Sequence, residues 1–266
     1  MEVKIVAKSD IGNFRGNNED NLLFLDRILP LDHIGTEGLL IASASLSMPI
    51  FLAVLDGMGG EENGEVASYI AAEKLLDWIS GQSHLDRITD VSLLDACVSM
   101  NGAVCNAIKQ YKCARMGTTL AMVVLTEEKM ICCNVGDSKI FSWTSGVLTQ
   151  ISSDHNNAEM LKQLGILGRS AELTQYIGVR PEVLEIQPSL MAVPCNEIDR
   201  FLVCSDGLTD MVSIKKLEEI MSGRAIEEVC SNLVDAANDA GGRDNITVIV
   251  GELQHASDNG YPKREE

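Results

Sequence analysis

The sequence predicts an α+β fold in which largely antiparallel sheets are covered on their outer sides by helices. Short apolar runs, which are typical of buried strands, occur in groups, and segments with helical periodicity occur in pairs between those groups. A doubly wound parallel sheet would instead alternate single strands with single helices. No internal repeat divides the chain, so we expect one domain over residues 1–254 and a polar C-terminal tail over residues 255–266.

The predicted strands are apolar runs bounded by turn-forming residues. The run FLAVL is followed by Asp56-Gly57, and the run FLVCS is followed by Asp206-Gly207. Each pattern indicates a buried strand that ends in a sharp turn. The expected strands are 3–7, 21–25, 50–55, 119–125, 130–135, 139–143, 201–204 and 246–252.

The predicted helices are segments in which apolar residues recur every three or four positions. In the segment 64–80, for example, Val66, Tyr69 and Ile70 fall on one helical face. The expected helices are 64–80, 92–111, 156–164, 213–221 and 226–239. The order of these blocks favours helix pairs outside central sheets.

Composition and charge exclude several classes of function. The chain has 266 residues, with 21 Lys and Arg against 39 Asp and Glu, which gives a formal net charge of −18. Because this charge repels phosphate backbones and anionic lipids, we expect neither nucleic acid nor a membrane as a partner. We also identify no signal peptide and no apolar window of about 18 residues that would predict a membrane span.

The cysteine pattern indicates free thiols. The chain has eight cysteines, and none of them forms a Cys-x-x-Cys pair. Cys132 and Cys133 are neighbours within an apolar run, which is typical of buried thiols. We therefore expect the reducing environment of the cytoplasm.

Acidic residues recur at the ends of the predicted strands. Asp56 and Asp206 follow strands, Asp244 precedes the run ITVIV, and Glu19 and Asp20 precede the run NLLFL. Each motif taken alone is more often a turn. Carboxylates that converge at one edge, however, form the all-oxygen site that Mg²⁺ or Mn²⁺ prefers.

The glycine after each aspartate fits the same interpretation. Gly57 and Gly207 would let the backbone turn sharply, so that a carbonyl group can also reach a cation.

The motifs also form an ordered set. In chain order they are RGNNED at 15–20, DGMGG at 56–60, MGTT at 116–119, GDSK at 136–139, SDH at 153–155, SDGL at 205–208 and DNIT at 244–247. This set resembles the PPM family of metal-dependent protein Ser/Thr phosphatases, the protein phosphatase 2C type, in its bacterial form. The resemblance covers about residues 3 to 252. It implies a four-layer α-β-β-α sandwich with two central antiparallel β-sheets.

The resemblance also implies a role for each acidic motif. The implied metal ligands are Glu19, Asp20, Asp56, the Gly57 carbonyl, Asp206 and Asp244. Asp56 is expected to bridge two metal ions, joined by Glu19 on one ion, while Asp206 and Asp244 hold the other. Arg15 is expected to bind the substrate phosphate. The implied catalytic residues are Arg15, Asp56 and Asp206, while Thr118, Asp137 and Asn245 are expected to support the site without acting in catalysis.

The implied reaction is hydrolysis of phosphoserine and phosphothreonine by a water molecule that bridges two divalent cations, Mn²⁺ or Mg²⁺. The expected substrates are phosphorylated proteins, including a Ser/Thr kinase and the substrates of that kinase. The protein is expected to act as a monomer in the cytoplasm. The choice between the two metals stays open, because both take oxygen ligands in octahedral geometry.

Several features depart from the family pattern. Met58 occupies the position of a histidine in eukaryotic relatives, so the leaving alkoxide needs another proton source, and for the candidate His155 a structural role is favoured. Residues 112–116 contain no acid, so a third metal is doubtful. The flap after His155 is short, and the connection 27–49 is long and has no functional explanation.

Two alternatives stay open at this point. A catalytically weak pseudo-phosphatase or regulatory module would bind a phosphoprotein partner through the same cleft. The missing acid before Gly117 mildly favours this alternative, and the retained carboxylates oppose it. The second alternative, a regulatory phosphatase that acts on an anti-sigma antagonist, often has an extra sensory domain, which the sequence does not show.

Overall fold

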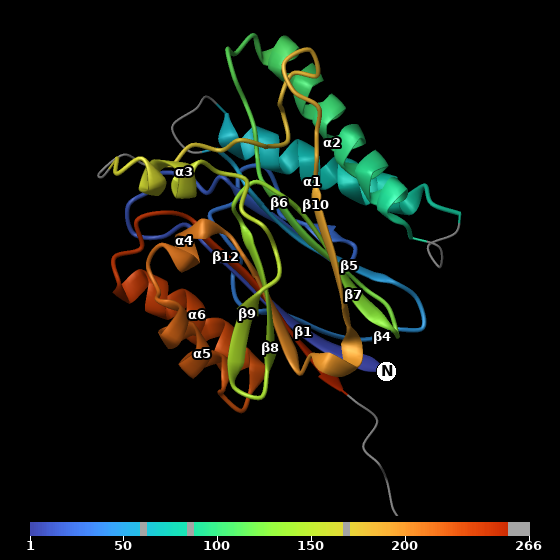
Figure 1. Ribbon diagram of the computed structural model, residues 1–266, viewed down its shortest axis with the longest axis vertical. Helices are drawn as coiled ribbons and strands as arrows, with labels where there is room; N and C mark the ends of the chain where they lie inside the picture. Colours follow the sequence, from blue (N-terminus) through green and yellow to red (C-terminus); the bar gives the residue numbers. More distant parts are fainter. Residues whose placement is uncertain (59–62, 84–87, 167–170, 255–266) are drawn as a thin grey trace, which may run out of the picture.

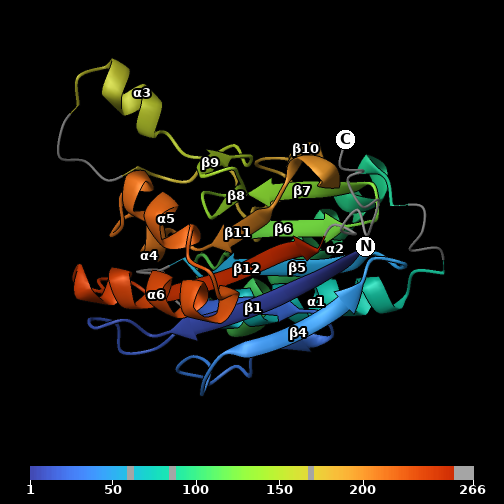
Figure 2. The same ribbon diagram turned by 90° about the horizontal axis from the view of Figure 1, so that it is seen from below.

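The computed structural model describes residues 1–58, 63–83, 88–166 and 171–254. Two six-stranded sheets pack face to face, and helices cover the outer face of each sheet (Figures 1 and 2). Neighbouring strands within both sheets are antiparallel. The predicted four-layer α-β-β-α sandwich is therefore confirmed.

Each sheet combines strands from both halves of the chain. The first sheet has the order β4-β1-β12-β11-β8-β9. Its strands are β4 (Leu40–Ser45), β1 (Glu2–Asp10), β12 (Ile246–Gln254), β11 (Arg200–Cys204), β8 (Lys139–Thr144) and β9 (Val147–Gln150). The second sheet has the order β10-β7-β6-β5-β2-β3. Its strands are β10 (Ser189–Pro194), β7 (Lys129–Val135), β6 (Leu120–Leu125), β5 (Ile50–Asp56), β2 (Asp20–Phe24) and β3 (Arg27–Ile28).

The helices form the two outer layers. The long helices α1 (Gly64–Ser80) and α2 (Asp90–Tyr111) pack on the second sheet. On the other side, α4 (Asp206–Thr209), α5 (Ile214–Met221) and α6 (Ile226–Asp239) pack on the first sheet. The short helix α3 (Ala158–Gln163) projects away from the sandwich (Figure 2), and a short 3₁₀ segment, η2 (Cys195–Glu197), precedes β11.

The central strands are apolar on both faces because both faces are covered. In β5, Leu52 and Val54 point into the core between the sheets. The alternate residues Phe51, Ala53 and Leu55 point toward α1 and α2. A strand buried on both sides reads as a continuous apolar run, which explains why the sequence predicts β5 and β11 so well.

Helix α2 corrects one expectation. By length and composition it is apolar enough to cross a membrane, although the sequence analysis identified no such segment. In the fold, half of the apolar 18-residue stretch of α2 is buried. Its residues Leu93, Met100 and Val104 pack in the core with α1 and the second sheet, so the apolar composition is explained by core packing.

Helices α1 and α6 begin and end where the sequence predicts. The sequence missed β3, β4, β9 and β10, which include the strands at all four sheet edges. In β4 half-buried and exposed positions alternate, so there is no apolar run to detect. This strand pairs with β1 and occupies part of the long connection 27–49. A short helix, α4, also stands where the sequence predicted only a turn after Asp206.

Candidate active site

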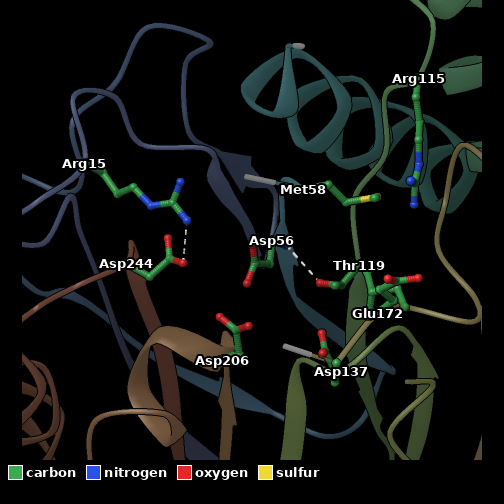
Figure 3. A pocket seen from close by; sticks show the side chains of 11 residues that line it. Arg15, Asp56, Met58, Arg115, Thr119, Asp137, Glu172, Asp206 and Asp244 are labelled. Atoms are coloured by element: carbon green, nitrogen blue, oxygen red, sulfur yellow. Dashed lines mark hydrogen bonds and ion pairs between the residues drawn. The ribbon is translucent and has the colours of Figure 1, made fainter. Parts of the chain in front are cut away.

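A cavity of about 310 Å³ is lined by residues that come from both sheets (Figure 3). Asp56 ends β5 in the second sheet, while Asp206 begins α4 directly after β11 of the first sheet. Arg15 belongs to the connection between β1 and β2, and Asp244 lies two residues before the start of β12. Four of the sequence-predicted site residues, Arg15, Asp56, Asp206 and Asp244, therefore surround one cavity.

The MGTT motif fixes the end of β5. The Asp56 backbone N–H donates a hydrogen bond to Thr119 Oγ1 at 3.0 Å. The Asp56 carbonyl accepts one from Thr118 Oγ1 at 2.9 Å. Because both backbone groups of Asp56 are held, its side chain is fixed at the cavity. These contacts give Thr118 the supporting position that the sequence analysis expected.

The glycines of the two Asp-Gly motifs are needed for close backbone approach rather than for a sharp turn. A Cβ atom on Gly57 would lie 2.4 Å from the Gly64 carbonyl oxygen, and one on Gly207 would lie 2.0 Å from the Asn245 carbonyl oxygen. Both distances are far below van der Waals contact, and neither glycine has a positive φ angle. The expectation of a conformational role was therefore wrong for these positions.

Asp20 is buried beside the cavity, with 1% of its surface exposed. Its Oδ2 atom accepts a hydrogen bond from Ser205 Oγ at 2.8 Å, whereas its Oδ1 atom has no hydrogen-bond partner. Burial raises the pKa of Asp20 to about 7, and hydrogen bonds from Thr247 and Ser205 oppose the rise. A buried oxygen without a partner is unusual, because desolvating it carries a free-energy cost.

The other carboxylates show the same electrostatic conflict. Loss of solvent, together with the charges of Asp137 and Asp210, raises the pKa of Asp206 to about 7. Burial and the neighbouring Asp20 and Asp206 raise the pKa of Asp56 well above its usual value. The pKa of Glu19 is also raised, mainly by burial. Like charges in a shielded space favour protonation or a bound cation.

Arg15 and Asp244 form an ion pair at the rim of the cavity, with 2.7 Å between Arg15 Nη2 and Asp244 Oδ2 (Figure 3). The hydrogen bond to Asp244 raises the pKa of Arg15. The neighbouring Asn245 supports this rim. Its Oδ1 accepts a hydrogen bond from the Glu19 N–H at 2.8 Å, and its Nδ2 donates one to the Asn17 carbonyl at 3.0 Å.

The carboxylates surround the cavity without converging on one point. In the described part of the chain, no three His, Cys, Asp or Glu side chains form a ready metal centre. Among the described residues, Glu19 and Asp20 do not line the cavity. The donor set nevertheless fits hard divalent cations, because it consists of oxygen atoms. The raised pKa values of these groups and the unpartnered Asp20 oxygen also indicate negative charge that lacks compensation.

Sequence reasoning missed two charged residues that line the cavity, Arg115 and Glu172. Arg115 lies in the segment 112–116, where the sequence analysis noted only that an acid is missing. Its guanidinium carbon is 5.1 Å from the centroid of the Tyr176 ring. Figure 3 shows the Arg115 side chain directed toward the cavity from the side opposite Arg15.

Asp137, which the sequence analysis expected to support the site without acting in catalysis, itself lines the cavity. Burial raises its pKa, and a hydrogen bond from Asn156 Nδ2 at 3.3 Å opposes this rise. His155, in contrast, makes two hydrogen bonds with the backbone of Gly136. The backbone N–H of His155 donates to the Gly136 carbonyl at 2.8 Å, and the His155 Nδ1 atom accepts from the Gly136 N–H at 3.3 Å. These bonds favour the structural role predicted for His155. The last two glycines of the DGMGG motif, 59 and 60, lie outside the described residues.

Comparison with known proteins agrees with the geometry of this site. A family model described as protein phosphatase 2C matches residues 41–246. The serine/threonine phosphatase stp of Listeria monocytogenes is 32% identical over 218 residues, which are 77% of this chain and 85% of that protein. Protein phosphatase PhpP of Streptococcus pneumoniae is 31% identical over 262 residues, 94% of this chain and 96% of that protein.

A solved structure extends the comparison to three dimensions. The catalytic domain of the serine/threonine phosphatase PstP, in complex with two manganese ions, matches with a TM-score of 0.73 and 26% identity. The match covers 95% of this chain and 99% of that domain. The chain described here belongs to the protein phosphatase 2C family and is a protein serine/threonine phosphatase.

Proposed function

We propose that this cavity hydrolyses phosphoserine and phosphothreonine esters with the help of two divalent cations held by its carboxylates. The observation that carries the proposal is the set of acidic groups with raised pKa values around a cavity that an arginine also lines. The proposed ligands are Glu19, Asp20, Asp56, the Gly57 carbonyl, Asp206 and Asp244. The PstP catalytic domain, which has the same fold, binds two manganese ions.

When bound, two such cations supply an activated water nucleophile and neutralise negative charge on the transferring phosphoryl group. The residues of this chain position them. Asp56 and Asp206 come from different sheets and face one cavity, so each carboxylate is held by a rigid strand end or helix start. Rigid placement lowers the reorganisation needed during the reaction.

Arg15 is proposed to bind the phosphate. A guanidinium carries five N–H donors, and Arg15 uses Nη2 to bind Asp244 at 2.7 Å. The remaining donors can bind two phosphate oxygens in parallel. Asp244 thereby orients Arg15 at the rim, where it meets a phosphate that enters the cavity.

We assign protonation of the leaving alkoxide to solvent water. Met58 lines the cavity but has no proton to donate. His155 is held by the Gly136 backbone, and burial lowers its pKa, so it is a poor acid source at neutral pH. We propose two metals rather than three, because residues 112–116 bring Arg115 to the cavity and supply no acid.

We further propose that the substrates are products of a Ser/Thr kinase, with the kinase itself among them, and that the protein acts as a monomer in the cytoplasm. All eight cysteines are free thiols, which supports a reducing compartment. Cell fractionation with an antibody to the protein tests the location, and recovery in a membrane or secreted fraction would contradict it.

The central experiment measures phosphate release from p-nitrophenyl phosphate and from a phosphothreonine peptide. We expect release with Mn²⁺ and none with excess chelator. Asp206→Asn should abolish release, whereas under the pseudo-phosphatase alternative the substitution would leave the binding of a phosphoprotein partner intact. Release that persists in chelator, or an unchanged rate in Asp206→Asn, would contradict the proposed metal site.

A further inference from the structure

A basic groove leads away from the active-site cavity along the end of α2. We define the basic groove by Lys109, Lys112, Arg115 and Arg180. We propose that it binds acidic residues, aspartate or glutamate, that flank the phosphorylated residue of a protein substrate. This inference rests on the proposed function and adds the sequence class of the substrate.

The groove is continuous with the active site because neighbouring cavities share residues. Arg115 lines both the active-site cavity and a second cavity of about 200 Å³. Ile108 and Arg180 line both this second cavity and a third one of about 390 Å³. Lys109 and Lys112 line the third cavity. A peptide whose phosphate occupies the first cavity can therefore continue past Arg115 toward Arg180.

The walls of the groove are fixed by contacts between segments far apart in the sequence. Arg180 Nη2 donates a hydrogen bond to the Ala114 carbonyl at 3.1 Å. Asn101 of α2 binds both sides of the adjacent loop, at 2.9 Å from Nδ2 to the Val179 carbonyl and at 2.7 Å from the Gly178 N–H to Oδ1. The groove is thus a preformed surface, which lowers the entropic cost of binding an extended peptide.

The charge of the groove is opposite to that of the whole protein. The chain carries a formal net charge of −18. Nevertheless, the four cations are all exposed, and in the described residues Glu182 is the one acid that lines the two outer cavities. Glu172 lines the active-site cavity and neither outer cavity, so the lining changes from mainly acidic at the phosphate site to mainly basic in the outer cavities. Charge complementarity of this kind selects partners and raises the association rate.

The groove leaves the cavity in one direction, so acidic residues should be preferred on one side of the phosphothreonine only, either before it or after it. The test uses three phosphothreonine peptides with neutral backgrounds, carrying three glutamates before the phosphothreonine, three after it, or three lysines on the preferred side. We expect kcat/KM for one glutamate peptide to exceed that for the lysine peptide by about tenfold at low salt, and the ratio to shrink as salt rises. Equal values for all three peptides would overturn the proposal.

Variants connect the preference to the groove. In Lys109→Glu and Arg180→Glu the advantage of the glutamate peptide should fall several-fold, because each substitution replaces attraction by repulsion. Lys215→Glu, which makes the same change on the exposed face of α5, is the matched control and should keep the preference. A preference that survives Lys109→Glu and Arg180→Glu in folded protein would place the selectivity elsewhere and overturn the assignment.

A small substrate separates this inference from the proposed function. Because p-nitrophenyl phosphate does not reach the groove, its hydrolysis reports on the active site alone. If the wild-type protein hydrolyses it with Mn²⁺ but shows no peptide preference, the groove proposal fails and the phosphatase proposal stands. If it is not hydrolysed at all, the active-site proposal is the one that fails.

Discussion

Asp20 and Asp56 lie directly opposite one another on the antiparallel strands β2 and β5. Like charges at such positions destabilise a sheet, and the charge of Asp20 is among the causes that raise the pKa of Asp56. Two opposed carboxylates in a shielded place can both stay ionised only with a positive charge nearby. This pair therefore connects the register of one sheet to the proposed metal site.

Metal binding should stabilise the folded protein. A cation that binds the folded state and not the unfolded chain adds about 2.7 kcal/mol of stability at a concentration one hundred times its Kd. We expect Mn²⁺ to raise the melting temperature measured by calorimetry, and chelator to reverse the rise. In Asp206→Asn the rise in melting temperature with Mn²⁺ should be smaller. Samples with and without Mn²⁺ are matched in ionic strength, so that a general effect of salt is excluded. A melting temperature that does not change with Mn²⁺ would contradict the proposed metal site.

The metal-free protein should lose stability as pH rises from about 4 to 7. Asp20 and Asp206 have pKa values raised to about 7 in the fold, against the usual value of 3.8. Between these values the folded state binds protons that the unfolded chain has released, so stability is greatest at the acidic end of this window and falls toward neutral pH. Chemical denaturation in chelator at several pH values measures the slope. Asp206→Asn should flatten it, and a slope of the opposite sign would count against the buried-carboxylate picture.

Asp206→Asn should reduce kcat by at least about a thousandfold, because losing one ligand charge removes several kcal/mol of transition-state stabilisation. Steady-state kinetics with Mn²⁺ provide the measurement. Asp199 is half-buried in the bend before β11, and its Oδ2 accepts a hydrogen bond from the Ser145 N–H. It does not line the cavity, so it supplies a matched control: Asp199→Asn should leave kcat close to the wild-type value. Comparable losses in both variants would point to a general charge effect.

Arg15→Ala should lower kcat/KM by about ten- to a hundredfold, since hydrogen bonds to charged groups contribute about 1.5–3 kcal/mol. Arg15→Lys should recover only part of the loss, because an ammonium group cannot bind two oxygens in parallel. Inhibition by inorganic phosphate offers a second readout, and its Ki should rise in both variants. An unchanged Ki would exclude Arg15 from phosphate binding.

Gly207→Ala should destabilise the protein and disrupt the site, because the new Cβ would lie 2.0 Å from the Asn245 carbonyl oxygen. Gly102→Ala is the control. Gly102 lies within α2, and a Cβ there would meet no atom within 4 Å. That substitution should stabilise the helix by about 0.5–1 kcal/mol. Urea denaturation measures the free energy of unfolding of both variants. Equal values for the two variants would contradict the role of Gly207 in close backbone approach.

The central strands could be predicted because each is covered on both faces. Apolar runs such as 50–55 and 201–204 can be recognised as strands without knowing which strands pair with them. The edge strands could not be predicted, because β4 and β10 pair on one side only and carry mixed side chains. Their place is determined by the free edges of β1 and β7, which are known only after the sheets have assembled.

The acidic motifs and their order were present in the sequence, and they were sufficient to indicate the family and an oxygen-lined site. Only the tertiary structure decided how the residues meet. Arg15 pairs with Asp244 across 229 positions of the chain, and Arg115 enters the same cavity from a loop that the sequence analysis noted only for a missing acid. Gly57 and Gly207 serve close approach between segments that are distant in sequence. Residue types and strand patterns are local properties, whereas these contacts depend on how two sheets and their loops pack together.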